Sequence, residues 1–189
     1  MTDLASMCYR NLILPVPFIP IECEETQDGK FHEIYVYERQ INRDMVDWLG
    51  SIGLRAMHGR YFYSPSTHRY NLHVDILENP DEYAYLNFVF GGKGSAMNWY
   101  SLKTDQQKFT ITNAVGKKIY GYKEEDCEII NTNVCLDSYK NFATLINAGI
   151  IHTMINPSEE RRCYSWFLYK EKRVCWHELA DIFKPWFIS

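Results

Sequence analysis

Hydrophobic and aromatic residues recur along this chain in short blocks of strand length. Many of the blocks are rich in β-branched or aromatic side chains, and turn-forming segments such as ENPD, GGKG and NPSEE separate them. The blocks lie at residues 32–38, 60–64, 70–76, 83–90, 97–102, 108–112, 142–146 and 162–169. At least eight strands in one chain predict a mostly β fold, with a double-stranded β-helix (jelly-roll) core or a barrel as its architecture.

Two segments follow a helical period instead. Asn42 is a plausible N-cap, Asp44 lies in the first turn, and an apolar stripe follows that ends near Gly53. The stripe consists of Met45, Trp48, Leu49 and Ile52. A second helix is predicted from about Trp176 to Lys184, before Pro185. We expect these helices to flank the β core, and the first to cover one face of a sheet.

Length and composition bound the organisation of the chain. Its 189 residues suffice for one domain with a sizeable core, and we expect residues 1–189 to form that single domain, because no repeat, low-complexity segment or linker divides them. Apolar residues make up 46% and aromatic residues 15% of the chain, which argues against disorder. The net charge is only −4 and the basic residues are scattered, so the sequence shows no pattern that indicates a nucleic-acid partner, although it does not exclude one.

The sequence also carries signals about location. The first twenty residues lack the shape of a secretory signal, and no apolar run approaches the roughly 20 residues needed to span a bilayer. We therefore expect a cytoplasmic protein with no membrane partner. The six dispersed cysteines form no CxxC pair and are expected to be free thiols.

A His-x-Asp motif stands in the predicted strand YNLHVDI. Side chains alternate along a strand, so His73 and Asp75 would share one face and could bind one metal ion. Alone this motif is weak, because such a pair arises often by chance and also suits a plain surface strand.

A second segment, LINAGIIHTMINPSEERRCYSWFLY, supplies the context. His152 ends an apolar run, a turn follows, and Arg161 and Arg162 open an aromatic strand. A hairpin here would bring Arg162 back beside His152. A guanidinium at the start of a buried strand needs an anionic partner, which is either a bound carboxylate or one of the protein's own Asp or Glu side chains.

Together these residues suggest a type of metal site. Two histidines and one carboxylate leave coordination positions open, as in non-haem iron(II) oxygenases. Thiolate sites do not compete, because the one cysteine near either motif, Cys163, would point opposite to Arg162 on an ideal strand. The accompanying arginine favours iron over zinc.

In their order along the chain, the segments HVD, LNFVFGGKGSAMNWY and INAGIIHTMINPSEERR resemble the 2-oxoglutarate-dependent oxygenase superfamily. They are most similar to its small prolyl-hydroxylase-like members, which phages often encode, so the resemblance also implies the cytoplasm of an infected host cell as one location. The matching positions are His73 and Asp75, Leu86 and Asn87, Trp99 and Tyr100, then His152 and Asn156. The resemblance covers roughly residues 60 to 170, and the joint order is more specific than any single motif.

The resemblance implies a site and an activity. His73, Asp75 and His152 would bind iron(II), and Arg162, ten residues after His152, would bind the distal carboxylate of the co-substrate 2-oxoglutarate. Arg161 is the alternate, because the residue two beyond the arginine is often Ser in the family and is Tyr164 here. Four further residues are implied near the co-substrate: Tyr63, Tyr70, Asn87 and Tyr100.

The implied reaction consumes O2 and 2-oxoglutarate, releases succinate and CO2, and hydroxylates a substrate. That substrate is a prolyl or other peptide residue, or a small molecule; the sequence does not distinguish them. Two alternatives stay open. One is a cupin-like jelly-roll metalloprotein, which needs the three metal ligands but no arginine, and the other is a non-enzymatic binding or virion module.

Overall fold

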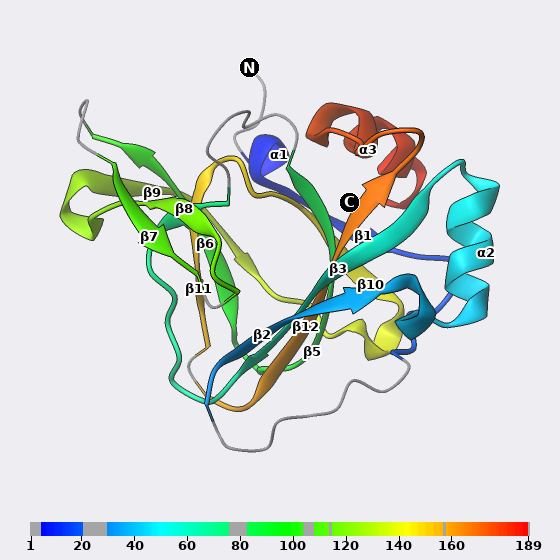
Figure 1. Ribbon diagram of the computed structural model, residues 1–189, viewed down its shortest axis with the longest axis horizontal. Helices are drawn as coiled ribbons and strands as arrows, with labels where there is room; N and C mark the ends of the chain where they lie inside the picture. The colour runs from blue at the N-terminus through cyan, green and yellow to red at the C-terminus, as the bar shows by residue number, and fades with distance from the viewer. Residues whose placement is uncertain are drawn as a thin grey trace.

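Two six-stranded antiparallel sheets face each other in the described part of the chain (Figure 1). The predicted metal ligands line a cavity together with residues of both sheets. The computed structural model describes residues 5–20, 30–75, 83–103, 108–113, 115–156 and 158–188. The sheet order places strands from distant parts of the chain side by side. This mostly β architecture is the double-stranded β-helix that the strand pattern predicted.

The first sheet contains the longer strands and is covered on its outer side. Its order is β1 (Tyr9–Ile13), β10 (Phe142–Asn147), β5 (Ala84–Gly91), β12 (Arg161–Tyr169), β3 (Arg55–Ser64) and β2 (His32–Tyr37). Alternate residues of β5, β12 and β3 point to the core beneath the helices, and the residues between them point toward the second sheet.

The second sheet carries both histidines of the predicted site. Its order is β7 (Phe109–Thr112), β8 (Lys118–Gly121), β4 (His73–Val74), β11 (Ile151–Ile155), β6 (Ala96–Leu102) and β9 (Cys127–Val134). Because β4 and β11 are hydrogen-bonded neighbours, they bring residues from two distant segments together.

Helices α2 (Arg43–Ser51) and α3 (Trp176–Phe183) lie against the first sheet, on the side away from the second sheet (Figure 1). Met45 and Leu49 of α2 and Leu179 and Phe183 of α3 are buried in one cluster with Trp166 of the sheet. Short helical turns complete the fold: α1 (Ala5–Cys8) and the 3₁₀ turns Glu38–Gln40, Glu124–Asp126, Ser138–Lys140 and Lys184–Trp186. Both predicted flanking helices are confirmed, because their apolar stripes match this buried face.

The eight strand predictions each correspond to a strand, but the sequence patterns missed β1, β8, β9 and β11. The predicted hairpin between the His152 segment and the arginine strand is wrong. β11 pairs with β4 and β6, whereas β12 pairs with β3 and β5, so the chain crosses from one sheet to the other. The buried Asn156 side chain stabilises this crossing by donating to the carbonyls of Ser64, Pro65 and Glu159.

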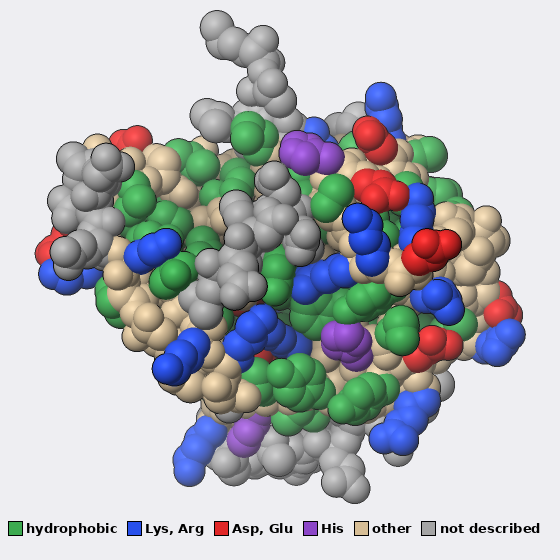
Figure 2. Space-filling model, turned by 45° about the horizontal axis from the view of Figure 1, so that its top comes forward, with side chains coloured by type: hydrophobic (Ala, Val, Ile, Leu, Met, Phe, Trp, Pro, Cys, Tyr) green, Lys and Arg blue, Asp and Glu red, His purple; other side chains and the backbone are tan. Residues whose placement is uncertain are grey.

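Acidic, basic and apolar side chains are mixed on the face of the molecule shown in Figure 2. In the described part of the chain, none of the helices has the length and apolar character required to cross a membrane. The cysteines at positions 8, 127, 135, 163 and 175 are free thiols, and Cys23 lies outside the described residues.

Candidate metal centre

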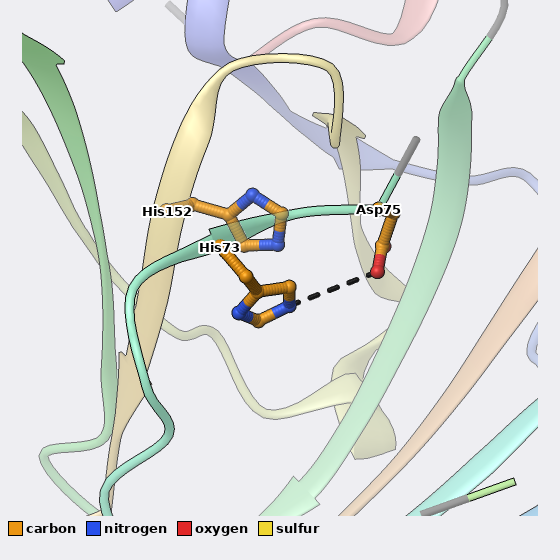
Figure 3. Close-up of side chains that lie close together, drawn as sticks. All are labelled: His73, Asp75 and His152. Carbon is orange, nitrogen blue, oxygen red and sulfur yellow. Dashed lines mark ion pairs between the residues drawn. The ribbon is translucent and has the colours of Figure 1, made fainter. Parts of the chain in front are cut away.

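His73, Asp75 and His152 lie together between the two sheets (Figure 3). His73 of β4 stands directly opposite His152 of β11 in the strand register, and Asp75 follows immediately after β4. One potential ligand atom from each residue lies within 4.8 Å of the other two, and His73 Nε2 is 3.7 Å from Asp75 Oδ1. The three side chains therefore converge from one sheet on a single point.

Backbone hydrogen bonds fix both imidazole rings. His73 Nδ1 lies 2.7 Å from the carbonyl oxygen of Asn71, and His152 Nδ1 lies 2.8 Å from that of Ile150. A carbonyl oxygen only accepts, so each Nδ1 carries the proton and each Nε2 keeps its lone pair. This is the arrangement of a metal-binding histidine, in which the other ring nitrogen is held by an acceptor.

The electrostatics of the site suit a cation. Burial, with a smaller contribution from His73, lowers the pKa of His152 to about 4, so its ring is neutral at pH 7. Burial alone would raise the pKa of Asp75, but His73, Arg60 and His152 outweigh it and hold that pKa below its usual value. A neutral imidazole and an ionised carboxylate are the forms that bind a metal ion.

The donor set fits a divalent first-row metal ion. Two imidazole nitrogens and one carboxylate oxygen on one side of the ion leave its other positions open, which is the facial arrangement of non-haem iron(II) sites. His73, Asp75 and His152 would hold iron(II) in this way.

A cavity of about 260 Å³ opens beside the three ligands, just below the range of roughly 300–1,000 Å³ usual for ligand sites. Arg161 of β12 lines it and is only 3% exposed. Its Nη2 lies 3.9 Å from the Cys135 sulfur, the Cys163 thiol is a second neighbour, and its Nε has no hydrogen-bond partner. Among the described residues, no carboxylate lies within 4.0 Å of this guanidinium.

The cavity holds Arg161 where we had expected Arg162. Arg161, Cys163 and Ser165 share the face of β12 that lines the cavity. Arg162 is on the opposite face, with its side chain 37% exposed and 3.9 Å from Glu160. Tyr164 and Trp166, further along β12, pack into the core beneath the helices. Because side chains alternate along a strand, this packing turns Arg161 toward the cavity and Arg162 away from it.

Two consecutive glycines lie against the start of β12, and Gly92 makes room for the Arg161 side chain. Gly92 has φ +66°, and a Cβ added there would lie 2.6 Å from the Cβ of Arg161. Gly91 has φ +67°, and its added Cβ would lie 2.6 Å from the carbonyl oxygen of Glu160. The GGKG segment, which reads from sequence as a flexible loop, thus provides the contact surface for the buried arginine.

The four other predicted residues divide into two pairs. Tyr70 and Asn87 line the cavity, where the Tyr70 hydroxyl is 2.9 Å from Ser64 Oγ and the Asn87 amide oxygen accepts from Ser165. Tyr63 instead packs in the core beneath the helices, and Tyr100 packs in a separate cluster with Ile151. Neither Tyr63 nor Tyr100 is among the residues that line the cavity.

The structure adds three cavity residues that the sequence motifs missed. Arg60 and Glu33 form an ion pair of 2.9 Å with both side chains 4% exposed, and Arg60 Nη1 is 3.9 Å from Asp75 Oδ1. Tyr85 also lines the cavity, and burial raises the pKa of its phenol. An arginine at the start of the predicted strand RYFYS was the one available signal, since a buried strand rarely carries an unpaired charge.

Comparisons with known proteins give partial likenesses. No family model matches the chain, and neither does any curated protein. Among solved structures, a Pseudomonas putida prolyl-4-hydroxylase is similar with a TM-score of 0.43 and 11% identity, over 87% of this chain and 94% of that one. An oxidoreductase of the 2OG-Fe(II) oxygenase family from Burkholderia pseudomallei gives a TM-score of 0.41 and 9% identity, over 85% and 76%.

A cysteine peptidase from Thevetia peruviana latex, peruvianin-I, reaches a TM-score of 0.36 at 9% identity, over 89% of this chain and 91% of that one. Likenesses at this level carry no argument about activity. What the chain does must be argued from the site itself.

Proposed function

We propose that this protein is an iron(II)- and 2-oxoglutarate-dependent oxygenase that hydroxylates a substrate. One observation carries the proposal: a cavity contains both a His-Asp-His cluster with fixed ring orientations and a buried guanidinium without a carboxylate partner among the described residues. A buried, unpaired guanidinium is costly, and a bound dicarboxylate would remove that cost. A cupin-like metalloprotein needs the cluster but gives no reason for the arginine.

The roles of the residues follow from their positions. His73, Asp75 and His152 hold the metal ion from one sheet, and Arg161 binds the distal carboxylate of 2-oxoglutarate from the other, in the role first assigned to Arg162. Bound iron(II), with 2-oxoglutarate and O2, supplies the oxidising chemistry that inserts oxygen into a C–H bond and releases succinate and CO2. Tyr70 and the apolar walls shape the cavity and exclude water from it.

Anaerobic titration with iron(II) and then 2-oxoglutarate tests the proposal. The expected result is a weak visible absorption band from the iron-bound co-substrate. It should vanish in the double variant His73→Ala and Asp75→Ala, which keeps Arg161 and the cavity. If the wild type shows no such band, or if the double variant shows it unchanged, the proposal is refuted. Succinate release with a panel of peptides and metabolites then searches for the substrate.

A further inference from the structure

A second buried arginine lies at the other end of the cavity. In the strand register Arg161 is opposite Ser64, and Arg60 is opposite Ser165. Arg60 and Ser64 are four residues apart on one face of β3, and Arg161 and Ser165 are four residues apart on one face of β12. The two arginines therefore stand about 13 Å apart along the strand direction. Arg60 Nη1 is 3.9 Å from Asp75 Oδ1. Arg161 and Arg60 therefore line different ends of the cavity, and Asp75 lies near the Arg60 end.

The two ends differ in charge. Arg161 has no carboxylate within 4.0 Å in the described residues, but Arg60 donates to Glu33 Oε1 at 2.9 Å. Glu33 is also held from the second sheet by Asn113 Nδ2, at 3.4 Å. The positive charge of Arg60 is thus already compensated inside the cavity. An anion bound there would add an unpaired negative charge next to Glu33, which is unfavourable in a desolvated site.

Arg60 nevertheless has donors to spare. A guanidinium carries five N–H groups, Glu33 accepts from Nη1, and Nε has no hydrogen-bond partner. Phe62, which is opposite Glu33 in the strand register, adds an apolar side chain to the cavity wall beside this ion pair. This end of the cavity suits an apolar group that carries an uncharged acceptor.

We propose that the Arg60–Glu33 pair is a specificity-determining element that selects a substrate with a neutral oxygen acceptor, such as an amide carbonyl, and rejects a carboxylate. The inference rests on the proposed function, because it assigns the Arg161 end to 2-oxoglutarate and the Arg60 end to the substrate. In a merely structural ion pair, the two residues would have no influence on which ligand binds.

Two probes of the same shape test the proposal: cyclopentanecarboxamide and cyclopentanecarboxylate. Each is titrated into the zinc-loaded wild-type protein with 2-oxoglutarate at saturation, so that the Arg161 end is occupied. Zinc is a diamagnetic substitute for iron, and the Nε–H resonance of Arg60 reports contact with each probe. The amide is expected to bind about tenfold more tightly than the carboxylate, since one charged hydrogen bond has about that effect.

The variant Glu33→Gln should reverse this order, because it removes the carboxylate 2.9 Å from Arg60 and leaves Asp75, a proposed metal ligand 3.9 Å away, as its remaining described carboxylate neighbour. Glu178→Gln is the matched control, since Glu178 forms an exposed ion pair with Lys170, and it should keep the wild-type preference. If Glu33→Gln does not fold, the ratio of the two affinities in the wild type decides the question alone.

The failures are distinguishable. If 2-oxoglutarate binds but the wild type prefers the carboxylate, or neither probe shifts the Arg60 resonance, this inference is wrong and the proposed function stands. If the protein binds neither metal nor 2-oxoglutarate, the proposed function fails and the inference fails with it.

Discussion

The two ends of the cavity place the same side chain in opposite electrostatic settings. At one end the Arg161 guanidinium is buried with no carboxylate within 4.0 Å in the described residues, and at the other the Arg60 guanidinium is paired with Glu33. A paired charge is stable without a ligand, whereas an unpaired charge is stabilised when an anion binds. From this contrast we propose that Arg60 serves the fold as well as a ligand, and that Arg161 serves a ligand alone.

Folding stability should separate the two ends most strongly. Arg60→Met leaves the buried Glu33 carboxylate without its ion-pair partner and should lower the free energy of unfolding by about 3–5 kcal/mol. Arg161→Met removes a buried charge without a carboxylate partner in the described residues, so it should leave stability unchanged or raise it by about 1 kcal/mol. Urea unfolding of the metal-free proteins measures both values. Equal losses in the two variants would contradict the distinction.

Co-substrate affinity should show the reverse order. Arg161→Met should weaken 2-oxoglutarate binding by roughly 10- to 100-fold, the effect of losing one or two charge-assisted hydrogen bonds. Arg60→Met should change this affinity far less. Calorimetric titration of the metal-loaded variants provides the comparison, limited to variants that remain folded. If Arg60→Met lost more 2-oxoglutarate affinity than Arg161→Met, the co-substrate would bind at the Arg60 end, contrary to the proposal.

Gly92 tests whether the Arg161 end depends on its glycine contact. Gly92→Ala brings a Cβ within 2.6 Å of the Arg161 Cβ, so it should displace the guanidinium and weaken 2-oxoglutarate binding several-fold. Gly116→Ala is the matched control, because Gly116 also has a positive φ, at +79°, but its added Cβ would contact nothing within 4 Å. Both variants should lose about 1–2 kcal/mol of stability from backbone strain. Equal 2-oxoglutarate affinities in the two variants would argue against the contact.

The smallest effect is expected on the outer face of the same strand. Arg162 is half-exposed and close to Glu160, so Arg162→Met should change both stability and 2-oxoglutarate affinity little, by about 0.5 kcal/mol or less. The same unfolding and calorimetric measurements apply. A tenfold loss of co-substrate affinity in this variant would restore Arg162 to the role that we now propose for Arg161.

The sequence predicted the fold class and the metal ligands, but it did not identify which of Arg161 and Arg162 faces the cavity. The strand-length blocks and the two apolar stripes predicted the fold class because they depend only on local periodicity. His73, Asp75 and His152 were predicted as metal ligands because their residue types and spacing match a metal site. Their meeting required β4 and β11 to pair, which no local pattern specifies.

The choice between Arg161 and Arg162 depended on strand parity. Arg162 was chosen by its spacing from His152, but the side-chain direction is set by Tyr164 and Trp166 packing beneath the helices. A shift of one residue moves every side chain of a strand to the other face. The Arg60–Glu33 ion pair could not be predicted for a similar reason, because it joins two strands whose register the sequence does not reveal.

A crystal structure of the protein grown without oxygen in the presence of manganese(II), as a redox-stable substitute for iron, and 2-oxoglutarate tests the central claim most directly. The account predicts a metal ion bound by Nε2 of His73, Nε2 of His152 and the Asp75 carboxylate, with the distal carboxylate of 2-oxoglutarate on the Arg161 guanidinium. A metal ion bound elsewhere, or a carboxylate on Arg162 or Arg60 with Arg161 unoccupied, would contradict it.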